Sequence, residues 1–193
     1  MPLPDSLDKI AGEILDYFRD PAASPPYAIY VYEPDQELAV RREMQDLRAY
    51  LNAKGISVAA ISLAELFWQA VDESGFYDSV VETEKASPND PWALQQVDSS
   101  LQEILTEKPS LADRVIAALE DKPKKCAVIL YRAGALYPVF RTSALLDDIR
   151  ERLKRPVVLL YPGHTVDPYG LKFMGKCKPA HGYRAKIFQR SSS

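Results

Sequence analysis

The chain has 193 residues, of which 47% are hydrophobic and 26% are charged, and its formal net charge is −3. These values are typical of an ordinary globular protein and exclude a disordered, fibrous or membrane-embedded chain. No apolar run approaches the roughly 20 residues needed to span a bilayer, and the first residues lack the basic and apolar regions of a secretory signal. We therefore expect a cytoplasmic protein with no membrane association. Its cysteines, Cys126 and Cys177, form no CxxC motif, so we expect two reduced thiols.

The first half of the chain alternates between helical and strand patterns. Residues 6–19 place apolar side chains at spacings of three or four, which predicts an amphipathic helix. Residues 27–32, rich in β-branched and aromatic types, predict the first buried strand. A helix over 36–53, ended by Gly55, then leads to a second strand over 56–62. This βαβ unit should have parallel strands and a right-handed connection.

The second half of the chain begins with a long stretch that contains no strand-like run. Residues 76–121 predict two or three helices, which we interpret as a helical insertion within the domain. Continuous apolar runs return at 125–131 and 156–161, with a helix over 142–153 between them. Such runs are typical of strands covered by helices on both faces. The segment 183–188 alternates more and predicts an edge strand.

Together these elements predict a single α/β domain over residues 1–193, a three-layer sandwich with a mostly parallel sheet of about five strands. Ligands of such sheets bind beyond the carboxyl ends of the strands, which directs attention to the loops at 33–36, 132–138 and 161–170. A phosphate-binding GxxxxGK[ST] loop should follow an early strand, but the first strand is followed by EPDQELAV. GxGxxG and GxSxG motifs are also absent from the sequence. We therefore expect no bound cofactor.

A few polar side chains in or near these loops have chemistry that a site could use. The chain has only two histidines, His164 and His181, so a catalytic mechanism with a histidine general base would have to use one of them. Together with Asp167 and Cys177 they are also residue types that bind metal ions. Their spacing matches no established metal motif, so exposed loop histidines are the simpler interpretation. Cys126 begins an apolar strand and is expected to be buried and unreactive.

Two tryptophans and two arginines have alternative interpretations. Trp68 and Trp92 lie on helical patterns, which predicts core or interhelix anchors. Arg132 and Arg141 flank the loop AGALYPVF, where a guanidinium could bind a phosphate or a carboxylate. Equally, an arginine there could tie this loop to a neighbouring helix or to the C-terminal strand.

The C-terminal segment is strongly basic. After Asp167 there is no acidic residue, whereas six basic residues follow: Lys172, Lys176, Lys178, Arg184, Lys186 and Arg190. This polarity could favour an acidic partner or a phosphate backbone. Lysines that protect an edge strand from pairing are the simpler explanation.

Three motifs in the strand-end loops carry a family resemblance. They are a Gly-x-x-Tyr-Pro-x-x-Arg turn, a Tyr-Pro-Gly turn and a closing Tyr-Arg, which follow a strand with an acidic-Pro end and a long helix. The motif residues are Gly134, Tyr137, Pro138, Arg141, Tyr161, Pro162, Gly163, Tyr183 and Arg184. In order and spacing, over nearly the whole chain, the sequence resembles the BrxB family of BREX phage-defence systems, formerly a domain of unknown function. The region 76–121 matches this family only as helices.

The resemblance implies a bacterial or archaeal protein encoded beside a large ATPase, a DNA methyltransferase and an alkaline-phosphatase-like protein. It would act with these BREX proteins to block phage DNA replication while methylation marks the host. The family has no assigned catalytic residues, and its sheet resembles that of a P-loop ATPase without the phosphate-binding loop. The resemblance therefore implies a non-catalytic component, not an enzyme.

Three functional hypotheses follow from these observations. The first is an adaptor that bridges BREX subunits, the phosphatase-like protein, the ATPase or the methyltransferase, through strand-end residues: Tyr137, Pro138, Arg141, Tyr161, Gly163, Tyr183 and Arg184. The second is a cryptic nucleotide-binding or hydrolytic enzyme that would use Asp35, Arg141, His164 and Asp167 in one cleft. The third is direct binding of DNA or RNA through the basic C-terminal segment.

Overall fold

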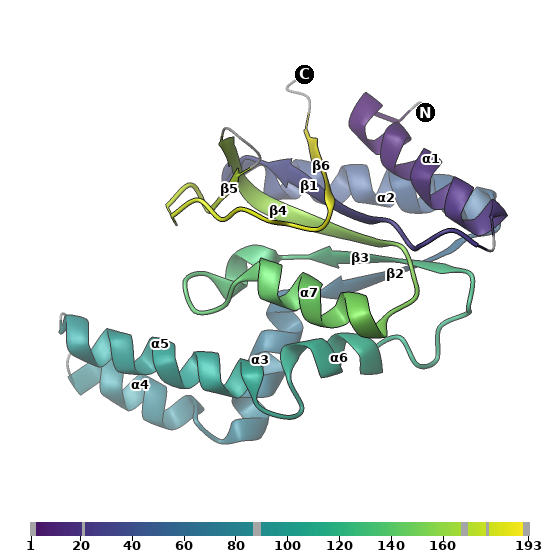
Figure 1. Cartoon of the computed structure of the whole chain (residues 1–193). Helices are drawn as coiled ribbons and strands as arrows, with labels where there is room; N and C mark the ends of the chain where they lie inside the picture. Colours follow the sequence, from purple (N-terminus) through teal and green to yellow (C-terminus); the bar gives the residue numbers. More distant parts are fainter. Residues whose placement is uncertain (1–2, 21, 87–89, 167–169, 177, 191–193) are drawn as a thin grey trace.

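Figure 1 shows the computed structural model of the chain, which describes residues 3–20, 22–86, 90–166, 170–176 and 178–190. The strands are β1 (Tyr27–Tyr32), β2 (Ser57–Ser62), β3 (Cys126–Tyr131), β4 (Val157–Val166), β5 (Gly170–Phe173) and β6 (Lys186–Gln189). The α-helices are α1 (Asp5–Arg19), α2 (Glu37–Ala53), α3 (Leu63–Ser74), α4 (Tyr77–Ala86), α5 (Pro91–Thr106), α6 (Leu111–Ala117) and α7 (Thr142–Arg152). Two short 3-10 helices, η1 (Pro34–Gln36) and η2 (Ala133–Leu136), follow β1 and β3.

The strands form one sheet in the order β2-β3-β4-β1-β6, and all four pairings along this path are parallel. The predicted α/β class with a mostly parallel sheet is confirmed. The last strand lies at an edge, as predicted, beside β1. The sequence did not predict β5, which pairs antiparallel with the second half of β4 and makes β4 longer than the apolar run that marked it.

Helices cover both faces of this sheet because the strand side chains alternate between two apolar clusters (Figure 1). In β1, Ala28 and Tyr30 pack against α1 and α2, whereas Tyr27 and Ile29 belong to the cluster with α3, α6 and α7. All six residues of β1 are buried, as expected for a strand at the centre of a three-layer sandwich.

The helical stretch between β2 and β3 divides into a part that packs on the sheet and a part that projects from it. Leu105, at the end of α5, and Leu111 and Val115 of α6 are buried in the core. Helix α4 and the first half of α5 extend away from the sheet as a helical pair (Figure 1). The described residues of 76–121 contain helices and no strand. None of the described helices combines the length and apolar character that crossing a membrane requires.

Helix α6 begins with a capping box that should make the stability of the fold depend on pH. The carboxylate of Asp113 accepts hydrogen bonds from the Ser110 amide at 2.8 Å and from the Arg152 guanidinium at 2.5 Å. These bonds hold the pKa of the Asp113 carboxyl at about 2, below its ordinary 3.8. A carboxyl with a lowered pKa stabilises the fold above its unfolded pKa, and this stabilisation is lost as the pH falls toward the folded value.

We therefore expect Asp113→Asn to lower the urea midpoint of unfolding at pH 7, and this deficit should shrink as the pH falls from about 5 to about 2. The measurement is a series of urea titrations of the two proteins across this range. A deficit that is constant down to pH 2 would show that the charge of Asp113 does not stabilise the helix.

Candidate functional site

The three loops that the sequence assigns to a site meet at the carboxyl ends of the parallel strands. A cavity of about 290 Å³ lies between them. It is lined by Pro34, Glu37, Arg41, Ala64, Arg132, Gly134, Ala135, Pro162 and Met174. Each of the loops 33–36, 132–138 and 161–170 supplies at least one of these residues, so the three loops converge on one cavity. This convergence follows from the parallel sheet, which brings these ends to one edge.

Carboxylates surround the start of α2 at this edge. Glu33 Oε1 lies 2.8 Å from His164 Nδ1, and the Tyr32 hydroxyl donates a hydrogen bond to Glu37. Burial, followed by the bond to Glu37, raises the pKa of the Tyr32 hydroxyl, which therefore stays protonated. A helix N-terminus normally attracts anions, but a phosphate here would meet Glu33, Asp35 and Glu37. The cavity itself is lined by Arg41 and Arg132 as well as by Glu37, so this edge presents charges of both signs to a ligand.

The residues of the enzyme hypothesis are divided between different places. His164 pairs with Glu33, and Asp35 is exposed in η1. Arg141 lines another cavity, of about 610 Å³, whose walls come from α5, α6, α7 and the loop before α7. Asp167 lies outside the described residues. Arg141 and His164 therefore lie at different sites, and the structure does not bring them into one cleft.

The candidate metal ligands give no site in the described part of the chain. There, no three His, Cys, Asp or Glu side chains lie close enough together to hold a metal ion. Of the four candidates, Asp167 and Cys177 lie outside the described residues, and His181 is exposed. Cys126 is 1% exposed at the start of β3, so the prediction of a buried thiol is confirmed.

The tyrosines of the predicted partner surface form an internal aromatic cluster instead. Tyr161 is 0% exposed, and its ring centroid lies 5.2 Å from that of Phe173 and 6.1 Å from that of Tyr183. Tyr137 is half-buried against Phe173, at 6.2 Å. The prediction that Tyr161 contributes to an accessible surface is wrong, because Tyr161 lies within the buried part of β4, Val157 to Gly163. The cluster holds the segment from β5 to Tyr183 on the sheet.

The other four predicted site residues differ in exposure. Gly163 is buried where β4 turns into its pairing with β5, and a β-carbon there would lie 2.3 Å from the Lys172 carbonyl oxygen. Gly163 therefore serves the backbone packing of this hairpin. Pro138, Arg141 and Arg184 are exposed, and for them a partner-binding role stays a prediction.

The basic C-terminal segment is partly neutralised by carboxylates of the same chain. Lys186 Nζ lies 2.6 Å from Glu13 of α1, and the Arg190 guanidinium lies 2.7 Å from Glu43 of α2. Glu43 also accepts a hydrogen bond from the buried Tyr30 hydroxyl. These two cations fix β6 to the helices, which leaves fewer free charges for a nucleic acid and weakens the third hypothesis.

The projecting helices expose large apolar side chains that the sequence interpretation placed in the core. Trp92 is 70% exposed, so the prediction that it is a core or interhelix anchor is wrong. Trp68 is 52% exposed and is therefore not a core residue, but its ring makes an edge contact with the Tyr77 ring of α4 at 6.4 Å, which agrees with the interhelix alternative. Helical spacing shows which residues share a face, but it does not show whether another element covers that face.

Trp92 belongs to a continuous uncharged surface of α5. It lines a shallow depression with residues at the spacing of one helix face, namely Gln95, Gln96, Ser99 and Ser100. We call these five residues the α5 stripe. The α5 stripe could have been found from the sequence alone, because its five uncharged residues recur at intervals of three and four.

Comparisons with known proteins agree with the resemblance noted in the sequence. The family model described as "BREX protein BrxB" matches residues 59–188, which is more than half of the chain. A relative from Bacillus cereus (strain H3081.97), named "BREX protein BrxB", is 24% identical over 188 residues, which cover 94% of each chain. No solved structure matches the chain, so the likeness of its sheet to P-loop ATPases stays a prediction. The family match extends from β2 to β6 and includes every strand-end motif after the first loop, and on this basis the chain belongs to the BrxB family.

Proposed function

We propose that the chain is a non-catalytic adaptor of a BREX phage-defence system, in which it holds other BREX subunits together in the cytoplasm. Membership in the BrxB family supports the assignment to BREX and, through it, a role in defence against bacteriophages. The α5 stripe is the observation that carries the adaptor role. The phosphatase-like protein and the large ATPase are the partners that we propose first.

Two features of the α5 stripe, an exposed tryptophan and the absence of charged residues, are typical of a protein interface. Protein interfaces are depleted in charged residues at their centres and enriched in tryptophan, which dominates many binding hot spots. Trp92 is 70% exposed, and none of the five residues of the stripe is charged. An isolated exposed apolar residue needs no explanation, but an exposed tryptophan on an uncharged helix face is typical of a surface that a partner covers.

The position of the stripe also suits an adaptor. Helices α4 and α5 project beyond the sheet, so a partner can reach the stripe without disturbing the core (Figure 1). The strand-end cavity does not unite the residues of the enzyme hypothesis, because its arginine, Arg141, lines a different cavity. These observations favour binding over catalysis.

Substitution of the stripe tests the proposal in a cell that expresses the whole BREX neighbourhood. We expect Trp92→Ser combined with Gln96→Glu to reduce recovery of BREX subunits on the tagged protein by at least about 30-fold, the effect of losing about 2 kcal/mol at a hot spot. Mass spectrometry of the purified material measures this recovery, and phage plating measures defence. Both should fall together.

Leu38→Ser is the matched control, because Leu38 is 68% exposed on α2, far along the chain from the stripe. It should leave recovery and defence unchanged, and thermal unfolding should show that both variants remain folded. Loss of recovery with Arg141→Ala, but not with the stripe variant, would move the interface to the sheet end. Recovery of the wild-type chain alone, under conditions where defence works, would overturn the adaptor proposal.

A further inference from the structure

The two edges of the sheet differ in their protection against further strand pairing. Natural edge strands usually carry lysine, proline or other features that prevent another chain from adding to the sheet. The edge strand β6 contains Lys186 and is flanked by Arg184 and Arg190. The edge strand β2 has the sequence SVAAIS, with no charge and no proline. Within the described residues, β2 pairs with β3 alone.

Strand β2 is less covered than the centre of the sheet. Val58, Ala59 and Ile61 are 8%, 7% and 6% exposed, whereas the residues of the central strand β1 are 0–4% exposed. Ala60 is the most exposed residue of β2. The Ser57 amide donates to the Lys125 carbonyl, so the alternate amides of Val58 and Ala60 point away from β3, toward the open edge.

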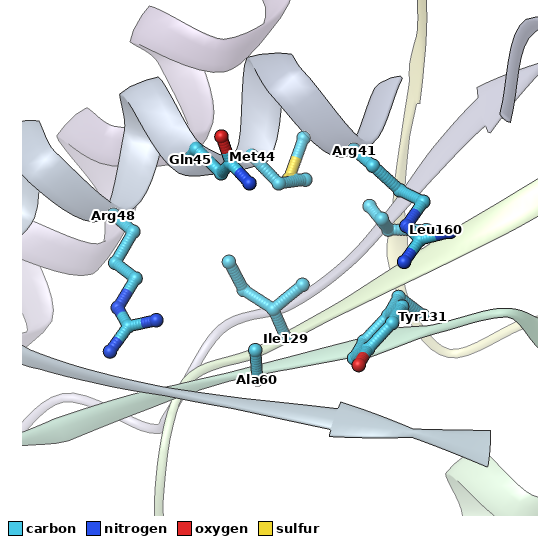
Figure 2. Close-up of a pocket in the computed structure, with 8 residues that line it drawn as sticks. All are labelled: Arg41, Met44, Gln45, Arg48, Ala60, Ile129, Tyr131 and Leu160. Carbon is cyan, nitrogen blue, oxygen red and sulfur yellow. The ribbon is translucent and has the colours of Figure 1, made fainter. Parts of the chain in front are cut away.

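A groove with arginines at both ends lies beside this edge, between α2 and the sheet. Figure 2 shows Arg41 and Arg48 extending from α2 toward the sheet, with Met44 and Ile129 between them. The groove has a cavity of about 200 Å³. Its small floor residue, Ala60, is the register partner of Ile129, and the short side chain of Ala60 leaves the space open. We call this feature the arginine groove; its remaining lining residues are Gln45, Tyr131 and Leu160.

The charges of the arginine groove are not neutralised within the described chain. No lining residue is acidic, and neither Arg41 nor Arg48 forms an ion pair with a described carboxylate. Glu37, one turn before Arg41, accepts a hydrogen bond from Tyr32 instead. Arg41 lies over the ring of Tyr131, 5.6 Å from its centroid, which directs the guanidinium toward the groove. Two unpaired cations beside an apolar floor complement a ligand with acidic and apolar groups.

We infer that β2 and the arginine groove bind an extended acidic segment of a partner protein, which adds to the sheet as a strand beside β2. Such a strand would take its main-chain hydrogen bonds from the open edge and its specificity from alternate side chains. One apolar side chain would fill the cavity beside Ala60, with a carboxylate two residues before it and another two residues after it. A volume of about 200 Å³ suits one side chain and is smaller than the usual range for drug-sized ligands, about 300–1,000 Å³.

The spacing of the arginines fits this arrangement. Arg41 and Arg48 are separated by seven positions on α2, which is about 10 Å along a helix. Carboxylates four positions apart on one face of an extended strand are separated by about 13 Å. Long flexible side chains make up the difference. This surface is separate from the α5 stripe, so the inference holds whether or not the stripe binds a BREX subunit.

Two labelled peptides of identical composition test the inference with the purified full chain. In Thr-Glu-Val-Leu-Val-Glu-Thr, with capped ends, both glutamates share a face with the central leucine. In Thr-Val-Glu-Leu-Glu-Val-Thr they lie on the opposite face. We expect fluorescence anisotropy to show saturable binding of the first peptide below about 1 mM and at least about tenfold weaker binding of the second.

Three variants assign the binding to this surface. Arg41→Glu with Arg48→Glu should abolish binding of the first peptide, and Ala60→Phe, which fills the cavity, should weaken it at least tenfold. Trp92→Ser should bind normally, which separates this test from that of the adaptor proposal. Equal binding of both peptides would indicate general attraction to acidic chains and overturn the inference.

Three other outcomes would also overturn the inference. The first is no saturable binding of the first peptide up to 1 mM. The second is displacement of the bound peptide by phenylacetate at similar concentration, because a small acid would then suffice as the ligand. The third is formation of dimers that Ala60→Glu disrupts, because the occupant of β2 would then be a second copy and not an acidic partner.

Discussion

Tyr161→Ala should lower the free energy of unfolding by about 3–5 kcal/mol, the usual cost of truncating a large buried aromatic side chain. Tyr161 is fully buried, and its ring contacts those of Phe173 and Tyr183. Removing it leaves a cavity between β4, β5 and the segment before β6. The measurement is equilibrium unfolding in guanidinium chloride, with the same denaturant slope required for both proteins.

Arg141→Ala is the control for this prediction. Arg141, like Tyr161, belongs to one of the strand-end motifs, but its side chain is exposed. Its free energy of unfolding should stay within about 0.5 kcal/mol of wild type. A Tyr161→Ala protein with unchanged stability that no longer recovers BREX subunits would instead make Tyr161 a surface residue. The two substitutions therefore separate the structural motif residues from those that remain available to a partner.

Gly163→Ala should be nearly as damaging, although it adds a single methyl group. The new β-carbon would lie 2.3 Å from the Lys172 carbonyl oxygen and 2.8 Å from the Tyr161 ring, so β4 and β5 would have to separate. We expect a loss of about 3 kcal/mol, at the upper end of the usual range for overpacking, because the obstructing atom belongs to the backbone. Equilibrium unfolding in guanidinium chloride measures this loss.

Gly134→Ala provides a matched comparison in the strand-end loops. Its nearest neighbour would be the Met174 sulfur at 3.3 Å, the flexible end of a side chain that can move. Gly134→Ala should therefore cost under about 1 kcal/mol. Equal losses at the two glycines would contradict the contact of Gly163 with the backbone of β5.

The sequence predicted the central strands well because burial on both faces leaves a clear pattern. The run at 27–32 became β1, and the run at 125–131, which is apolar from Cys126 onward, became β3 (Cys126–Tyr131). Strand β5 left no such pattern, because it has four residues and pairs with β4 through a local hairpin. A short strand of this kind is defined by its partner and not by its own composition.

The candidate site was predictable in its topology but not in its surfaces. Convergence of the strand-end loops follows from a parallel sheet, and the structure places Pro34, Arg132 and Pro162 around one cavity. Burial of Tyr161 does not follow from its motif, because tyrosine suits both cores and interfaces. The arginine groove could not be predicted from the sequence either, because it depends on how α2 crosses the sheet beside the small side chain of Ala60.

The position of β1 has a consequence for how the protein is made. The first strand to leave the ribosome pairs with β4 and β6. Strand β4 begins at Val157, about 125 residues after β1 ends at Tyr32, so β1 is made roughly 6–25 s before β4 at ordinary rates of synthesis. During this interval β1 is an unpaired apolar segment, and its later pairings span most of the chain, which is typical of slow folding. A nascent chain that stalls before β4 therefore cannot bury its first strand in the sheet and is at risk of aggregation.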